Sequence, residues 1–175
     1  MVTLKNENGL SIFLLAALLC VNIAGSAQEN EPRKDSIYSL IYFGAASCYY
    51  CNVEKNIANI NKMAIQIKKA NSDLKLKLIL VGMDKGITEG WNYVGKYELS
   101  NWDEVSVGSF YENELALSYL NSSEIPGVPH VMIIKHNTVT GKYNIKNTER
   151  QSIRIDLVGG DQIDKWINGS FSFEK

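Results

Sequence analysis

Residues 37–60, IYSLIYFGAASCYYCNVEKNIANI, join an apolar run, two cysteines three positions apart and the start of an amphipathic pattern. The run Ile37–Phe43 is rich in β-forming residues and has few breaks, which predicts a strand buried on both faces. Small residues follow and end this strand. Apolar side chains then recur at helical spacing, which predicts a helix from near Cys48 to near Asn71.

A second strand is predicted at Leu74–Val81, where LKLKLILV alternates and then becomes continuously apolar. With a helix between them, the two strands are expected to be parallel and joined by a right-handed crossover. In sheets of this kind, reactive groups collect beyond the carboxyl ends of the strands. Cys48 follows the first strand directly, so it is predicted to lie at that edge.

The rest of the chain predicts a mixture of helices and strands. Trp91 and Trp102 fall within it and are interpreted as core residues. The expected elements are helices at 87–98, 111–120 and 161–167, strands at 105–107 and 130–135, a turn at 137–142, and a returning antiparallel strand at 143–145 or 152–157.

The charges are balanced, with 18 basic and 19 acidic side chains and a formal net charge of −1. Proteins that bind nucleic acid through its phosphates need clustered positive charge. The composition therefore argues against nucleic acid as a partner, and 175 residues suggest a single folded domain.

The first residues differ in character from the rest. A positive charge at Lys5 precedes the apolar block Leu10–Ala24, and small residues follow it. This order is typical of a secretory signal peptide, and the block is short for a membrane span. We expect a signal peptide at 1–27, a polar tether at 28–35 and one domain at 36–172.

Export to the periplasm or another extracytoplasmic compartment is therefore expected, with no stable membrane span after cleavage. Two alternatives remain for the leader. One is an uncleaved anchor. The other is lipidation of Cys20, against which Leu19 argues, because lipoprotein signals have a small residue at that position.

Cleavage removes Cys20 and leaves Cys48 and Cys51 as a pair. The mature chain is long enough to fold on its hydrophobic core, so it does not need this pair as a staple. A thiolate is the reactive form of cysteine, and a helix N-terminus favours an anion. Cys48 is thus predicted to be the exposed attacking thiol, and Cys51 the buried resolving thiol.

Two other readings of the pair are an inert structural disulfide and a metal site. Zinc would need four ligands, and the sequence has no second C-x-x-C. Two thiolates with His130 would suit Cu(I), which keeps a copper site as an alternative.

The order of strand, C-Y-Y-C, helix and strand, with G-V-P before a later strand, resembles the thioredoxin fold. The segment from Cys51 to Glu54, CNVE, is similar to the C-x-x-C-x-x-E pattern of exported TlpA/ResA-like thioredoxins. IPGVP at 125–129 resembles their segment before the fourth strand. The resemblance implies a three-layer α/β/α sandwich with a central mixed sheet. The long separation of Cys51 from Pro129 implies an insertion before the cis-proline strand.

The resemblance also implies roles for single residues. Pro129 corresponds to the family's cis-proline beside the disulfide, and Val128 to the residue whose backbone pairs with a bound substrate strand. Glu54 corresponds to an acidic residue near the cysteines that can accept or donate protons. Tyr49 and Tyr50, between the cysteines, are expected to contact substrate.

Three positions depart from the family. Tyr42 stands where many thioredoxins have a buried aspartate six residues before the first cysteine. Ser47 replaces the usual tryptophan, and Tyr50 replaces the usual proline. These differences leave the direction of electron flow and the route of proton transfer open.

The expected function is an exported thiol–disulfide oxidoreductase that acts through Cys48 and Cys51. Its partners would be protein thiols or disulfides and a redox partner protein, and no cofactor or metal is required. Two alternatives stay open: a copper-binding or metallochaperone protein using the same cysteines, and a binding module that kept the fold without turnover.

Overall fold

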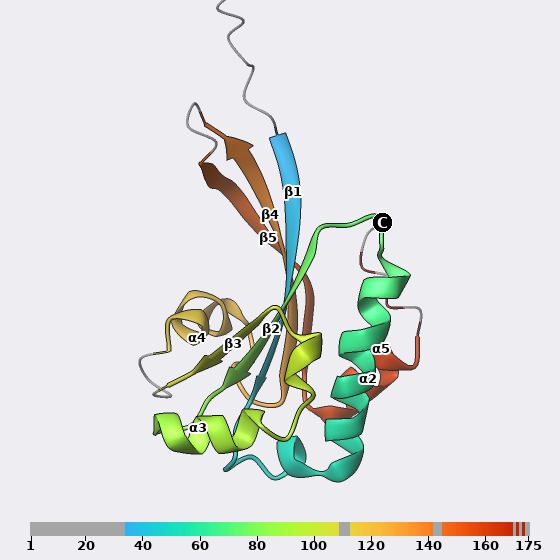
Figure 1. Ribbon diagram of the computed structural model, residues 1–175, viewed down its shortest axis with the longest axis vertical. Helices are drawn as coiled ribbons and strands as arrows, with labels where there is room; N and C mark the ends of the chain where they lie inside the picture. Colours follow the sequence, from blue (N-terminus) through green and yellow to red (C-terminus); the bar gives the residue numbers. More distant parts are fainter. Residues whose placement is uncertain (1–33, 109–112, 142–144, 170, 172, 174–175) are drawn as a thin grey trace, which may run out of the picture. The chain divides into compact units, whose positions relative to one another are not determined.

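A mixed sheet forms the centre of the protein, seen here in a computed structural model that describes residues 34–108, 113–141, 145–169, 171 and 173. The predicted leader at 1–27 lies outside these residues. The strands are β1 (Lys34–Gly44), β2 (Leu76–Gly82), β3 (Glu104–Val107), β4 (His130–Thr140) and β5 (Lys146–Val158). Their order in the sheet is β3-β2-β1-β4-β5 (Figure 1). β1, β2 and β3 are parallel, whereas β4 is antiparallel to both β1 and β5.

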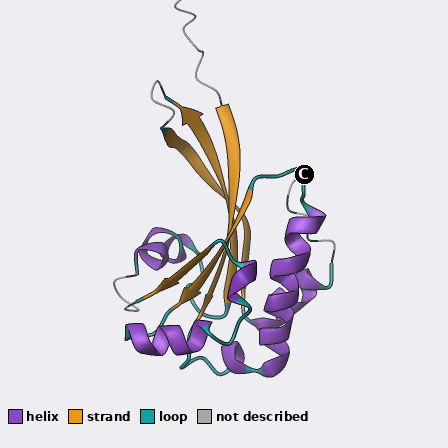
Figure 2. Ribbon diagram, in the orientation of Figure 1, coloured by secondary structure: helices purple, strands orange, loops and turns teal. Residues whose placement is uncertain are grey.

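Helices cover both faces of the sheet (Figure 2). They are α2 (Glu54–Ala70), α3 (Ile87–Val94), α4 (Glu114–Ser118) and α5 (Gly160–Ile167). Buried residues of α2, α3 and α5 share one core cluster with one face of the sheet, and α4 packs in a second cluster on the other face. The predicted three-layer α/β/α sandwich with a mixed sheet is confirmed. Within the described ranges, no helix combines the length and apolar content needed to cross a bilayer.

β1 is the central strand because its sequence is apolar on both faces. All residues from Leu40 to Phe43 are fully buried, with Leu40 and Tyr42 facing the α2 layer and Ile41 and Phe43 facing the α4 layer. Lys34 and Asp35, assigned to the polar tether from the sequence, are the first residues of this strand. Burying each aliphatic or aromatic side chain contributes about 1.5–3 kcal/mol, which fixes this strand in the middle of the fold.

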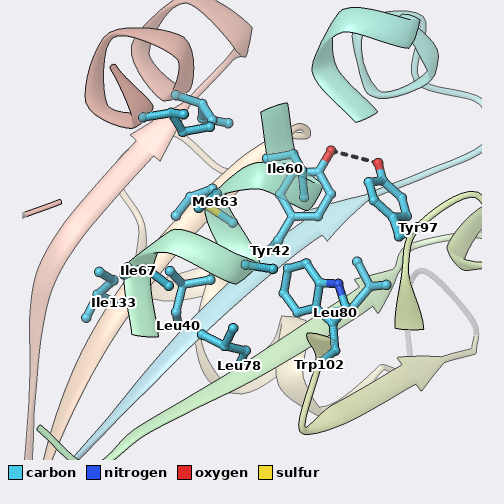
Figure 3. Close-up of a cluster of buried hydrophobic side chains, with 14 of the residues drawn as sticks. Leu40, Tyr42, Ile60, Met63, Ile67, Leu78, Leu80, Tyr97, Trp102 and Ile133 are labelled. Atoms are coloured by element: carbon cyan, nitrogen blue, oxygen red, sulfur yellow. Dashed lines mark hydrogen bonds between the residues drawn. The ribbon is translucent and has the colours of Figure 1, made fainter. Parts of the chain in front are cut away.

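α2 packs on the sheet through a stripe of apolar side chains at helical spacing. Ile60, Met63 and Ile67 are completely buried. Figure 3 shows them in one cluster with Leu40 and Leu78 of the sheet. The periodicity that predicted this helix is confirmed.

The helix begins later than expected. The chain first makes a 3₁₀ turn at Tyr50–Asn52, and then Val53, extended at φ −66° and ψ 128°, interrupts it before α2 starts at Glu54. Asn52 explains the interruption, because its side-chain Nδ2 donates to the Cys48 carbonyl at 2.6 Å. In a continuous α-helix the backbone N–H of residue 52 would occupy that carbonyl, so the side chain competes with the helix.

The second half of the chain differs at several points from the elements predicted from the sequence. The predicted turn at 137–142 is wrong in part, because β4 continues to Thr140. The returning strand is β5, which contains the predicted 152–157 segment. α4 is shorter than the predicted helix at 111–120, whose first two residues lie outside the described part. Trp102 is buried as expected, whereas Trp91 is 49% exposed.

Candidate redox site

The sheet register brings the two predicted halves of the site together. Phe43, next to the end of β1, pairs with His130, the first residue of β4. The segment that follows β1 therefore meets the segment that precedes β4. Cys48 Sγ lies 3.5 Å from the carbonyl oxygen of Val128. The Val128–Pro129 peptide bond is cis, as the resemblance implies.

Cys48 and Cys51 form a disulfide, with their Cα atoms 5.3 Å apart. Cys51 is completely buried in the core cluster on the α2 face, whereas Cys48 is partly exposed. The backbone N–H of Cys51 points to Cys48 Sγ at 3.1 Å. A hydrogen bond of this kind favours a thiolate on Cys48. The difference in access makes Cys48 the sulfur that an incoming thiol can reach.

The donor near Cys48 belongs to the 3₁₀ turn and not to the α2 terminus. The sequence placed Cys48 at the start of the long helix, where the helix dipole would act on it. Because α2 begins at Glu54, that part of the prediction is wrong. One local N–H, from Cys51, replaces the expected set of free helical donors.

Two polar side chains brace the cysteine loop. Asn52 Nδ2 lies within hydrogen-bonding distance of the Ala45 and Ala46 carbonyls as well as that of Cys48. Asp84, which follows β2, accepts a hydrogen bond from the Ala46 N–H at 2.9 Å. Asn52 Oδ1 in turn accepts from Lys96 Nζ. Neither Asn52 nor Asp84 was predicted as a site residue, although asparagine and aspartate near a turn commonly bond to the backbone.

Tyr49 and Tyr50 project from the loop into solvent. They are 78% and 66% exposed, and their rings contact each other edge to face at 5.4 Å. The residues that line a hollow beside them are Ala46, Ser47, Tyr49, Asn52, Val53 and Lys96. Large exposed aromatic side chains at a reactive site are suited to contact a partner.

Glu54 lies at the first position of α2 and is exposed. The partial burial expected from the sequence is not observed. A carboxylate in the first turn of a helix interacts favourably with the helix dipole, which gives Glu54 a structural reason to be there. Its proposed role in proton transfer stays a prediction.

Beneath the disulfide, three tyrosine hydroxyls meet in the core. The Oη atoms of Tyr93 and Tyr97 are 2.7 Å apart, and Tyr42 Oη lies 3.3 and 3.2 Å from them respectively (Figure 3 shows the Tyr42–Tyr97 contact). Asn56 Nδ2 donates to Tyr42 Oη at 3.1 Å, and Tyr97 Oη donates to the Cys51 carbonyl at 3.4 Å. Burial raises the pKa of all three tyrosines, so they remain neutral hydroxyls.

His130, the copper ligand of the alternative reading, is completely buried at the start of β4. Its Nε2 lies 2.5 Å from Asp156 Oδ1 on β5. Met132 lies two residues further along β4, so its side chain is on the same face of the strand as His130. Met132 packs in the core cluster on the α4 face, opposite the cluster that holds Cys51. Among the residues that the structure describes, no group of three or more His, Cys, Asp or Glu side chains could hold a metal ion.

The mixed sheet, the C-x-x-C disulfide after β1 and the cis-proline before β4 define a thioredoxin-like fold with a partly exposed cysteine pair. No protein-family profile matches the chain, and no curated protein matches it.

Solved structures with a similar fold were found at low identity. The thioredoxin domain of a thiol–disulfide oxidoreductase from Bacteroides vulgatus is 16% identical, with a TM-score of 0.40 over 75% of this chain and 77% of that one. A thiol:disulfide interchange protein from Bacteroides sp. is 18% identical, with a TM-score of 0.42 over 77% and 75%. Copper-bound ScoI from Arabidopsis thaliana is 15% identical, with a TM-score of 0.39 over 77% and 82%.

Proposed function

We propose that the protein is an exported thiol–disulfide oxidoreductase that exchanges disulfides with protein substrates through Cys48 and Cys51. The observation that supports this most is the asymmetry of the disulfide. Cys48 is accessible and faces the Val128 carbonyl, whereas Cys51 is sealed in the core. A purely structural staple has no need for one sulfur to be partly exposed while the other is sealed.

The exchange proceeds in two balanced steps. A substrate thiolate attacks Cys48 Sγ, a mixed disulfide forms, and the electron pair of the broken S–S bond remains on Cys51. A second substrate thiolate then attacks the substrate sulfur of the mixed disulfide and releases Cys48. The substrate loses two electrons and two protons, and the protein gains them as two thiols. In the reverse direction, the Cys51 thiolate attacks Cys48 Sγ and releases the reduced substrate.

The Val128 carbonyl and the exposed tyrosines provide the substrate-binding part of the proposal. A peptide that lies along Val128 in an extended conformation could donate a backbone N–H to this carbonyl, as in strand addition. Tyr49 and Tyr50 would then contact side chains that flank the substrate cysteine. Recognition would depend on the substrate's backbone near its cysteine and on few of its side chains. Such recognition allows several different proteins to serve as substrates.

Export and the TlpA/ResA-like subgroup belong to the same proposal. They are supported by the apolar segment at 10–24 with small residues after it, and by the C-x-x-C-x-x-E spacing that ends at Glu54. Cell fractionation and N-terminal sequencing of the mature protein test the cleavage after residue 27. Recovery of the intact leader on a membrane-bound protein would support the uncleaved anchor.

The central experiment is trapping with Cys51→Ser. The variant should accumulate a mixed disulfide between Cys48 and exported proteins, and Cys48→Ser should accumulate none. The wild-type protein should also catalyse reduction of a peptide disulfide by a small dithiol. Absence of both trapping and catalysis would leave the binding-module alternative in its place.

The copper alternative makes a different prediction. It requires one-to-one Cu(I) binding that is lost in His130→Ala. The oxidoreductase proposal requires exchange activity in metal-free buffer with a chelator present. The measured reduction potential of the Cys48–Cys51 couple then gives the direction, since a strongly reducing value fits a reductase and an oxidising value an oxidase or isomerase.

A further inference from the structure

The three-tyrosine cluster of Tyr42, Tyr93 and Tyr97 lies in the same buried cluster as Cys51. Its three side chains are buried. Their hydroxyls are polar, and no strand or helix needs them for its backbone hydrogen bonds. Tyr97 already reaches the Cys51 backbone, with its Oη 3.4 Å from the carbonyl oxygen. A group of buried hydroxyls at this place calls for a reason beyond packing, because three phenylalanines would fill the space without polar atoms to satisfy.

The chain makes room for the cluster at Gly44, the last residue of β1. A Cβ atom added there would lie 1.9 Å from Tyr93 Oη and 2.7 Å from its Cζ. Any residue other than glycine would therefore displace the hydroxyl from its position. The cluster thus depends on a strand residue without a side chain as well as on the three tyrosines.

The hydroxyls have more acceptors in reach than protons. The three Oη–Oη contacts and the contact with the Cys51 carbonyl all need a hydroxyl proton, and only three such protons exist. Asn56 supplies its own proton to Tyr42 and relieves none of these. A hydroxyl proton turns about the Cζ–Oη bond while the ring stays fixed. The cluster can therefore redirect a hydrogen bond without moving heavy atoms.

Opening of the disulfide creates a demand for such a bond. When a thiolate attacks Cys48, the departing electron pair leaves Cys51 as a thiolate in a site sealed from water. A buried anion without donors is strongly disfavoured, and hydrogen bonds to it lower that cost. Glu54, the carboxylate that follows the pair most closely in sequence, is exposed and is no donor when ionised.

We propose that the Tyr42, Tyr93 and Tyr97 hydroxyl cluster is the polar partner of the Cys51 sulfur, to which it donates a hydrogen bond when the disulfide opens. This inference rests on the proposed function, since it assumes that the disulfide opens in use. The hydroxyls stabilise the leaving thiolate and keep their protons throughout. The proton that later converts this thiolate to a thiol comes from the substrate thiol that supplied the electrons.

The test compares Tyr97→Phe, Tyr42→Phe and Tyr93→Phe with Tyr38→Phe. Tyr38 is also buried on β1 and faces the same side as Tyr42. It lies about 13 Å from Tyr42 toward the start of the strand, where it packs on Phe173. The first readout is the rate at which dithiothreitol opens the disulfide of the full chain. The second is the reduction potential of the couple, measured by equilibration with the same dithiol.

Loss of the donor should slow opening about tenfold in at least one of the Tyr97→Phe, Tyr42→Phe and Tyr93→Phe variants, since a hydrogen bond to an ion is among the stronger ones. The reduced state should become less favoured, and a tenfold change in equilibrium corresponds to a potential about 30 mV more negative. A change in one variant alone identifies the donor. Unchanged rates and potentials in all three variants, or an equal change in Tyr38→Phe, would overturn the inference.

A structure of the reduced wild-type protein tests the same claim without a substitution. One tyrosine Oη should lie within hydrogen-bonding distance of Cys51 Sγ, and a sulfur surrounded only by carbon atoms would contradict the inference. This remains decisive if a phenylalanine variant does not fold. Because dithiothreitol replaces a protein substrate, both measurements are independent of the trapping experiment, so the two proposals can fail separately.

Discussion

Asp84 Oδ1 accepts a hydrogen bond from the Ala46 backbone N–H at 2.9 Å, which fastens the loop before Cys48 to the segment that follows β2. Asp84 is 5% exposed, and its other carboxylate oxygen has no hydrogen-bond partner among the described residues. The bond to the Ala46 N–H is therefore the hydrogen bond that the Asp84 carboxylate makes to the described residues. It links the position of Cys48 to the second strand of the sheet.

Asp84→Ala should lower the free energy of unfolding by about 1–2 kcal/mol, because the Ala46 N–H loses its partner. Asp84→Asn keeps an acceptor oxygen at the same place and should lose less. Chemical denaturation of the oxidised proteins measures both. Equal losses in the two variants would show that the charge, and not the bond to Ala46, is what matters.

Gly44→Ala should destabilise the protein by about 1–3 kcal/mol, as expected for overpacking, because the new methyl group would collide with the Tyr93 hydroxyl. Gly160→Ala is a matched control, since no atom lies within 4 Å of the added Cβ and the position is in α5. Thermal and denaturant unfolding compare them. A neutral Gly44→Ala would mean that the tyrosine moves aside without cost.

The exposed tyrosines should affect substrate contact and leave stability unchanged. Replacing Tyr49 and Tyr50 together by alanine should change the free energy of unfolding by less than about 0.5 kcal/mol. It should weaken reaction with a peptide disulfide about tenfold while leaving reaction with dithiothreitol unaffected. Ile153→Ala on β5, 42% exposed, is the control. An equal loss of reaction rate with the peptide disulfide and with dithiothreitol would indicate a change in the reactivity of Cys48 itself.

His136 should make the protein less stable under mildly acidic conditions. Burial, and next the charge of Lys77, hold the pKa of His136 below its ordinary value of 6.5. Its Nε2 faces Ser39 Oγ at 3.1 Å, and Tyr119 packs against the ring. The unfolded chain then takes up a proton that the folded chain resists, so stability falls as the pH drops below about 6.5.

His136→Gln removes that proton uptake. The free energy of unfolding should depend less on pH between about 6.5 and 5 in the variant than in the wild type. Urea titrations at several pH values measure the two slopes. Identical slopes would assign the acid sensitivity to other groups.

The sequence predicted the parts of the fold that carry a strong periodic pattern. β1 and β2 are apolar enough to be central strands, and the stripe containing Ile60 and Ile67 marks the buried face of α2. The disulfide and the cis bond at Pro129 were predicted from the cysteine spacing and the resemblance. These features depend on local sequence, so they can be read without knowing how distant segments pack.

The tyrosine cluster could not be predicted in the same way. Tyr42, Tyr93 and Tyr97 each look like ordinary core residues, and only the position of α3 and of the turn after it brings the hydroxyls of Tyr93 and Tyr97 to that of Tyr42. Trp91 shows the same limit, because a half-turn in the orientation of α3 decides whether it or Tyr93 is buried. The late start of α2 was missed because periodicity does not report the side-chain bond from Asn52 to Cys48.

The pairing of Phe43 with His130 has a consequence for how this protein can vary. Two adjacent strands bring the reactive sulfur and the carbonyl opposite it together, and Asp84 after β2 holds the loop that carries the sulfur. The segment with α4 supplies none of the residues described above that hold this loop or form the tyrosine cluster. That segment can therefore acquire new surface features, and with them new partners, while the exchange chemistry stays as it is.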